Sequence, residues 1–329
     1  MAVRNTETRI PTGLVASDLG DAVAATDGRC TLVSFLASPL AAGQETTYVL
    51  FVTDAGLAAS VASYDWLFAE EGSFPQDTST TVGVASYTPA SIGNLTVTVR
   101  ALDSGGTELA SLTLVQDVGP LNPALETLIQ SANDNPGPGA NNPDVLREIV
   151  NAYFTYYQSV VLKVPEAGDA FKRYVCSFLF DGTSKKTPDE RGTFLDQLAD
   201  ALESNEDAFP IIAAQGAGVC GIRLSLLAMT FPSASPLLPW TELPQESNQN
   251  AVADEKLRQT LAALSDEDKI DIFNITRFPK TNILHCGNII EALRDKYFPG
   301  ASFDDVLTGM SGTRQHWITL HYSMGPLSV

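Results

Sequence analysis

Short runs of alternating apolar and polar residues fill the first third of the chain. Across residues 29–118 these runs are rich in Thr and Val and are separated by Gly, Pro and Asp. Closely spaced runs of this kind are typical of antiparallel strands, because the side chains of a strand point alternately to its two faces. We expect strands at residues 30–36, 47–53, 63–68, 95–102 and 108–115, and no helix between them.

The clearest alternation lies in residues 95–102, where Leu95, Val97 and Val99 fall on one face. The turn Asp103-Ser104-Gly105-Gly106 follows, and its glycines allow the chain to reverse tightly. Residues 108–115 then return beside the preceding strand, so the pattern predicts a hairpin.

Two motifs in this segment resemble those of PKD-type immunoglobulin-like domains. That family carries Tyr-x-Trp-x-Phe on one strand, and later an aromatic residue, a glycine and an alternating strand. The matching residues here are Tyr64, Trp66 and Phe68, then Tyr87, Gly93 and residues 95–99. Where the family has Gly-Asp-Gly after the Phe, this chain has Ala69-Glu70-Glu71-Gly72. The resemblance implies an Ig-like β-sandwich with Trp66 between its sheets.

Glycines and prolines divide the chain near residue 120. Gly119-Pro120 begins this stretch, and a second Pro- and Gly-rich stretch follows at residues 133–143. Regular structure does not continue through such a composition. The fold class is therefore multidomain β plus α. We predict an N-terminal extension at residues 1–28, the PKD-like or Ig-like β-sandwich at 29–119, a linker at 120–143 and a mainly α-helical domain at 144–329.

Beyond the linker, apolar residues recur at helical spacing. Asn142-Pro143-Asp144 has the features of a helix start, and Thr187-Pro188-Asp189-Glu190 is a second start with the form of a capping box. Ser265 and Ser302 are expected helix caps. Further helices are predicted at residues 251–264, 265–274, 282–298 and 302–309, with an irregular loop at 231–244 and a strand at 316–322.

The chain is strongly acidic, with a formal net charge of -19 and a pI near 4.4. Such a surface repels phosphate backbones and anionic lipids, so neither nucleic acid nor membrane insertion is expected. The N-terminus lacks the apolar segment of a secretory signal. We expect cytoplasmic synthesis without a signal peptide, with release in a phage-like particle as a further route.

The best candidate for chemistry is Cys220, in the loop Gln215-Gly216-Ala217-Gly218-Val219-Cys220-Gly221 before an apolar run. A cysteine at a helix start faces backbone N–H groups, which lower the thiol pKa. The order Gln215, Cys220, His316 resembles papain-like and transglutaminase-like hydrolases, which implies an oxyanion donor, a nucleophile and a base. Residues 317–329 contain no Asp, Asn, Glu or Gln to orient the histidine. We therefore favour Cys220 as a small residue packed at a crowded helix start.

Other groups of residues are weaker candidates for a functional site. On a strand, His316 and His321 point to opposite faces, and the adjacent His285 and Cys286 are poor chelating partners, so no metal is expected. No cofactor motif is present in the sequence. The paired acids Glu70-Glu71 and Asp304-Asp305 indicate a solvated loop and a helix first turn, and Arg277 and Lys280 are expected to pair with nearby acids.

These patterns favour a non-enzymatic interaction or structural protein with a protein partner, in which the Ig-like module presents or docks the helical domain. A component or cargo of a phage-like particle fits this description. The alternative is a cysteine-dependent hydrolase or transferase that uses Cys220. A third hypothesis is carbohydrate binding by exposed aromatic residues of the sandwich, for which Tyr87 and Phe74 are the candidates.

Overall fold

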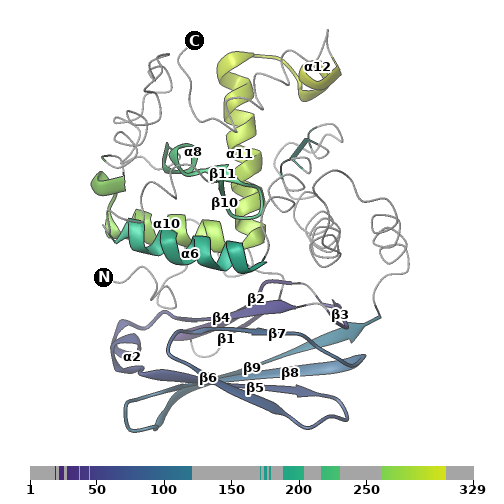
Figure 1. Cartoon of the computed structure of the whole chain (residues 1–329), viewed down its shortest axis with the longest axis vertical. Coiled ribbons are helices and arrows are strands. Elements are labelled where there is room, and N and C mark those ends of the chain that lie inside the picture. Colours follow the sequence, from purple (N-terminus) through teal and green to yellow (C-terminus); the bar gives the residue numbers. More distant parts are fainter. Residues whose placement is uncertain are drawn as a thin grey trace. The chain divides into compact units, whose positions relative to one another are not determined.

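The structure is a computed structural model. It describes residues 22–25, 28–36, 38–43, 45–120, 188–203, 216–229 and 261–308, together with Leu19, Phe171, Tyr174, Val175, Phe178 and Gln259. The chain divides into two compact units, Ala2–Thr155 and Tyr156–Val329. It contains both sheets and helices, and its two larger sheets lie in the N-terminal part (Figure 1). Within the described residues, no helix has both the length and the apolar character needed to cross a bilayer.

The first unit contains a four-stranded and a five-stranded sheet. The four-stranded sheet has the order β1 (Ala22–Ala25), β2 (Cys30–Ser34), β4 (Thr46–Val52) and β7 (Val84–Tyr87). The five-stranded sheet has the order β3 (Leu40–Ala41), β9 (Glu108–Gly119), β8 (Gly93–Leu102), β5 (Ser63–Glu70) and β6 (Gln76–Thr80). Neighbouring strands are antiparallel except for β3 and β9, which are parallel.

The five predicted strands are all present near their predicted bounds, but two details differ. Strand β1 lies in the segment predicted to be an N-terminal extension, and it pairs with β2, so the sheet begins before residue 29. A short helix, α2 (Ala55–Ser60), follows β4, where no helix was expected. Its N-cap is Asp54, whose Oδ1 accepts a hydrogen bond from the Leu57 N–H at 2.7 Å. One buried residue, Leu57, is too little to give the helix an apolar periodicity.

Alternation along β5 and β8 builds the core between the two sheets. Trp66 is fully buried, which confirms its prediction as a core residue, and its Nε1–H donates to Thr80 Oγ1 at 3.0 Å. Tyr48 of β4 links the two sheets, because its ring lies 5.8 Å from the Phe68 ring and its hydroxyl donates to Gln116 Oε1 at 2.9 Å. The polar contact between Tyr48 and Gln116 is buried, so it also fixes how the sheets meet.

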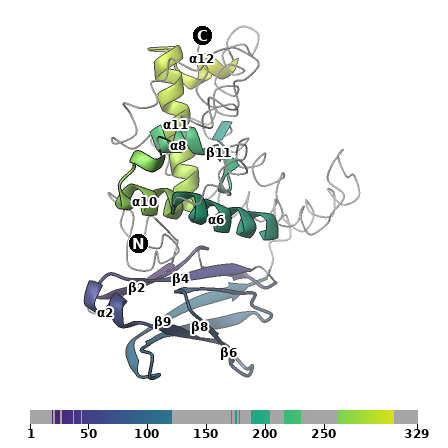
Figure 2. The ribbon, with the colours of Figure 1, turned by 60° about the vertical axis from the view of Figure 1, so that its left-hand side comes forward.

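The described elements of the second unit are mostly helices (Figure 2). They are α6 (Pro188–Leu202), the hairpin of β10 (Gly216–Ala217) and β11 (Ile222–Arg223), α8 (Leu224–Met229), α10 (Asp266–Arg277), α11 (Pro279–Tyr297) and α12 (Phe303–Thr308). Helix α10 contacts both α6 and α11. Helix α11 begins before its predicted start, because Pro279 occupies its first turn. The helix predicted after Asn142, the loop at 231–244 and the strand at 316–322 lie outside the described residues.

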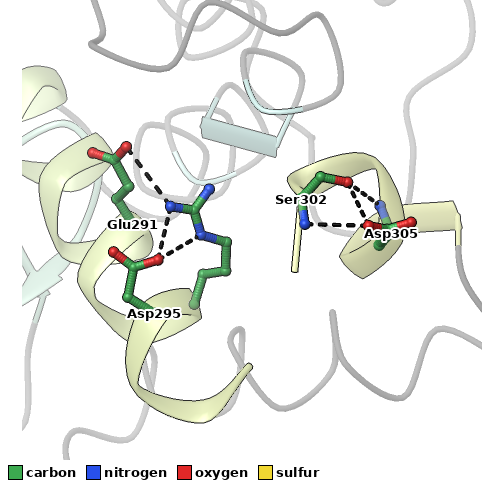
Figure 3. A network of polar contacts seen from close by, with 5 residues as sticks. Glu291, Asp295, Ser302 and Asp305 are labelled. Atoms are coloured by element: carbon green, nitrogen blue, oxygen red, sulfur yellow. Dashed lines mark hydrogen bonds and ion pairs between the residues drawn. The ribbon is translucent and has the colours of Figure 1, made fainter. Parts of the chain in front are cut away.

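Both predicted serine caps are confirmed. Ser265 Oγ accepts from the Asp268 N–H at 3.1 Å, and Ser302 forms a capping box with Asp305. Figure 3 shows this box beside α11. Near the end of that helix the Arg294 guanidinium donates to Asp295 at 2.8 Å, and its carbon lies 4.7 Å from the Phe303 ring centroid. The arginine therefore holds α12 against α11 through a cation–π contact.

Candidate functional site

Cys220 lies in the turn of the β10–β11 hairpin and not at a helix start. Gly218 has φ +70° and Gly221 has φ +58°, and these left-handed residues turn the chain into β11 before α8 begins at Leu224. The prediction that Cys220 lies at a helix start was therefore wrong. The glycine-rich stretch that predicts a loop here closes a hairpin. The Cys220 side chain is 2% exposed and forms no disulfide.

Asn282 of α11 holds this turn in place. Its Oδ1 accepts from the Cys220 N–H at 2.9 Å, and its Nδ2–H donates to the Ala217 carbonyl oxygen at 3.4 Å. A Cβ at Gly218 would overlap the same amide group. The Cys220 N–H is thus engaged by a buried side chain. Of the predicted catalytic residues, Gln215 and His316 lie outside the described residues, so the proposed set stays a prediction.

The two metal-ligand candidates that are described, His285 and Cys286, are adjacent on α11. His285 Nδ1 lies 3.0 Å from the Thr281 carbonyl oxygen. Burial lowers the pKa of His285, and the contact with Thr281 offsets this only in part. Cys286 is buried and not disulfide-bonded. No group of three metal-ligating side chains occurs within the described ranges, and His316 and His321 lie outside them.

Two buried cations, Arg277 and Lys280, lie where α10 meets α11. Arg277 Nε–H donates to Asn274 Oδ1 at 2.8 Å, and its guanidinium carbon lies 5.0 Å from the Phe278 ring centroid. Arg277 therefore contacts a side-chain amide and an aromatic ring. These contacts show how the elbow between the helices accommodates a charge, since Arg stacks on aromatic faces and donates in fixed directions.

Glu70, at the end of β5, is a buried carboxylate that sequence reasoning missed. It was expected in a solvated loop with Glu71, but its side chain is 7% exposed. Its Oε1 accepts from the Tyr87 hydroxyl at 2.7 Å and from the Ala90 N–H at 2.9 Å, and its Oε2 accepts from the Ser91 N–H at 2.7 Å. The signal was present in the sequence, because the inward alternation that includes Trp66 and Phe68 continues to position 70.

The hydrogen bonds of Glu70 decide its charge state. Burial raises the pKa of Glu70, but the bonds donated by Ala90, Tyr87 and Ser91 outweigh burial, so the pKa lies below its ordinary value. Burial, together with the hydrogen bond to Glu70, raises the pKa of Tyr87 to about 12. A carboxylate and a neutral phenol therefore persist together at neutral pH.

Glu70 joins two loops at one end of the first unit, and a backbone bond attaches a third. We call residues 42–43, 71–75 and 88–92 the loop end. The Gly43 N–H donates to the Pro89 carbonyl oxygen at 2.7 Å, and the Glu71 N–H donates to the Asn94 carbonyl oxygen at 3.0 Å. Together with the bonds from Glu70 to Ala90 and Ser91, these contacts fix the loops to the ends of the strands.

The loop end carries exposed apolar side chains. Phe74 is 96% exposed and Ile92 is 63% exposed. Tyr87, the other aromatic candidate for a sugar contact, instead lies with its ring 4.4 Å from the Phe68 ring and nearly parallel to it, at 4°. One face of the Tyr87 ring is therefore covered within the unit. Phe74 is the described aromatic residue that the loop end offers to a ligand.

Charges near the loop end are acidic. Glu45, Glu71 and Asp117 are exposed there. Arg29 and Arg100, the arginines among the described residues of this unit, lie toward the opposite ends of their strands. Because charges separated by more than about 8 Å are largely screened at physiological salt, these arginines do not neutralise the loop end.

No model of a known protein family matches the chain, and no curated protein matches it. Among solved structures, the beta-1,2-glucanase from Parabacteroides distasonis matches with a TM-score of 0.24 and 11% sequence identity. The match covers 68% of this chain and 32% of the glucanase. So low a score carries no argument about fold or activity.

Proposed function

We propose that this chain is a non-catalytic interaction or structural protein that binds a protein partner through the loop end of an Ig-like module of the PKD type. The strand order supports the Ig-like assignment. In Ig domains one sheet has the order A-B-E-D and the other contains C, F and G. Here β2, β4 and β7 correspond to A, B and E, and β5, β8 and β9 correspond to C, F and G.

The observation that carries the proposal is the rigid presentation of Phe74 and Ile92. Isolated exposed apolar residues are ordinary, but these two lie on loops that a buried carboxylate ties together. Binding to preorganised loops costs less conformational entropy than binding to loops that must first be ordered. Large side chains on such loops are the usual anchors of a protein interface.

The charge distribution defines the partner. Glu45, Glu71 and Asp117 form an acidic rim, so a complementary surface has an apolar centre surrounded by Lys or Arg. Such pairs accelerate association and are weakened by salt. A component or cargo of a phage-like particle is a setting compatible with this proposal, by analogy at the level of the fold.

The test is affinity capture from native lysate with the full chain as bait, followed by binding measurements on the purified partner. Ile92→Ser and Glu71→Lys should each weaken binding about tenfold, the size expected for loss of one interface anchor or reversal of one rim charge. Leu67→Ser, an exposed apolar residue on the outer face of β5, should leave binding unchanged. Recovery of nothing but the free chain under all conditions, or a partner insensitive to both loop-end variants, would refute the proposal.

We do not propose the cysteine-dependent hydrolase, because no described contact favours it. The Cys220 side chain is buried, and its backbone N–H donates to Asn282 Oδ1 in place of a substrate oxyanion.

A further inference from the structure

Strand β6 is an edge strand without the lysine, proline or bulge that commonly protects such an edge. Among the described strands it pairs only with β5, and its other edge has no partner strand in the part of the chain that the structure describes. Its five residues, Gln-Asp-Thr-Ser-Thr, contain no Lys and no Pro, and five consecutive pairs with β5 show no bulge. Residues 76–79 are exposed. Natural edge strands are normally blunted by lysine, proline, bulges or a covering segment, and an unprotected edge is a template for another strand.

The sequence of β6 is complementary to itself. When two copies pair antiparallel about Thr78, Asp77 of each lies opposite Ser79 of the other, and the Thr78 residues face each other. No two carboxylates are then directly opposed. Cross-strand Thr–Thr pairs and hydroxyl–carboxylate pairs are favourable, whereas opposed like charges are unfavourable. Asp77 and Ser79 lie on the same face of the sheet. On that face the Ser79 hydroxyl donates to Asp65, and the next residue of β5 on the face, Leu67, pairs with Asp77.

The residues that flank β6 extend this complementarity. Phe74 and Val82 are each four positions from Thr78, and both are exposed, Val82 at 36%. The strand pairing ends at Gln76 and Thr80, and Val82 lies in the turn that follows, so a two-fold axis through Thr78 brings Phe74 of one copy and Val82 of the other to the same end of the new strand pair. Burial of apolar surface at both ends of the new strand pair adds to the backbone hydrogen bonds in its centre.

We propose that two copies of this chain associate through β6, antiparallel about Thr78, to form one continuous sheet across the dimer. The interface is isologous, because each copy contributes the same patch. A net charge of -19 on each copy opposes association at long range. Added salt screens this repulsion, so the dimer should tighten as ionic strength rises.

Sedimentation velocity of the full chain over a range of concentrations tests the inference. Ser79→Glu places two glutamates opposite two Asp77 residues and should weaken the dimer about tenfold or more, while Ser79→Lys places opposite charges there and should preserve or tighten it. Both variants remove the hydroxyl bond to Asp65 and also change the charge beside Asp65 within one copy, so urea unfolding of each variant as a monomer separates that effect from the charge across the interface. Ser104→Lys, in the exposed β8–β9 turn, controls for the change in net charge and should have a smaller effect than Ser79→Lys.

Hydrogen exchange supplies a second measurement. Amides of β6 that are not bonded to β5 should exchange more slowly as the chain is concentrated, and Val82→Ser should reduce this protection. A chain that remains monomeric at millimolar concentration would overturn the inference, and so would a dimer whose affinity is equal in Ser79→Glu and Ser79→Lys. Loop-end variants such as Ile92→Ser should leave the dimer unchanged, so failure here is separable from failure of the proposed function.

Discussion

Replacement of Glu70 by glutamine should destabilise the first unit more than any other change of one carboxylate among its described residues. The carboxylate accepts from two backbone N–H groups and one phenol, divided between its two oxygens. Glutamine retains one acceptor oxygen and turns its amide NH₂, which can only donate, toward the remaining donor. In its better orientation it keeps the bonds from Tyr87 and Ala90 and places its NH₂ against the Ser91 N–H.

The expected cost follows from these contacts. A hydrogen bond to a charged group contributes about 1.5–3 kcal/mol, and the substitution removes one such bond and weakens the other two by removing the charge. We expect a loss of about 2–4 kcal/mol in the free energy of unfolding. Glu71→Gln is the matched control. Its side chain is exposed, so the change should stay within about 0.5 kcal/mol.

Urea unfolding, together with hydrogen exchange at Ala90 and Ser91, measures the effect. In Glu70→Gln these two amides should exchange faster, with the larger change at Ser91, while amides in the centre of β8 should follow only the global loss of stability. Equal effects of Glu70→Gln and Glu71→Gln, or unchanged exchange at both amides, would show that the carboxylate does not hold the loops.

The same contacts predict how stability depends on pH. The pKa of Glu70 is lower in the folded chain than its ordinary value of 4.5, so its contribution is complete above that value and is lost as the pH falls through the lower, folded pKa. The pKa of Tyr87 rises from 10.0 to about 12, so its contribution is present below pH 10 and is lost as the pH rises toward 12. Tyr87→Phe should abolish the alkaline loss that comes from this residue and leave the Phe68 stacking in place.

Two further predictions concern the second unit. Gly218→Ala and Gly300→Ala each place a side chain at positive φ, which costs about 1–2 kcal/mol, but only at Gly218 does the new Cβ overlap Asn282, so Gly218→Ala should lower the urea midpoint clearly further. Iodoacetamide at neutral pH should label Cys220 no faster than Cys30, because both side chains are buried, and markedly faster labelling of Cys220 would revive the hydrolase hypothesis.

Strand positions followed from the sequence because alternation is a local property that burial on one face imposes. The strand at residues 63–70 shows this, since Trp66 points inward as predicted and Tyr64 and Phe68 on the same face are also buried. The same rule applied one step further would have found Glu70, but an acidic residue at the end of a strand is ordinarily read as solvated. Its partners come from residues 87–91, at the end of β7 in the other sheet and in the loop that leads to β8, so only the tertiary structure places them beside it.

The prediction of a helix start at Cys220 failed for a different reason. A glycine-rich stretch before an apolar run predicts a loop that leads into a helix, and α8 does follow. The two-residue strands on either side of the turn are too short to alternate, so the hairpin leaves no periodic signal. The clamp from Asn282 is sixty-two residues away in the chain and depends on how α11 packs. Such a contact is a property of tertiary structure.

Phe74 couples the two proposed surfaces, and this coupling is itself testable. Phe74 belongs to the loop end, and in the proposed β6 dimer it lies at the end of the strand pair that also carries Val82 of the second copy. The Phe74 side chain cannot be covered by a partner and by a second copy at once, so each ligand should lower the affinity for the other by the same factor. Phe74→Ser should weaken both associations, whereas Ile92→Ser should weaken only partner binding and Ser79→Glu only the dimer. If saturating partner leaves the dimer affinity of the wild-type chain unchanged, then Phe74 serves at most one of these interfaces.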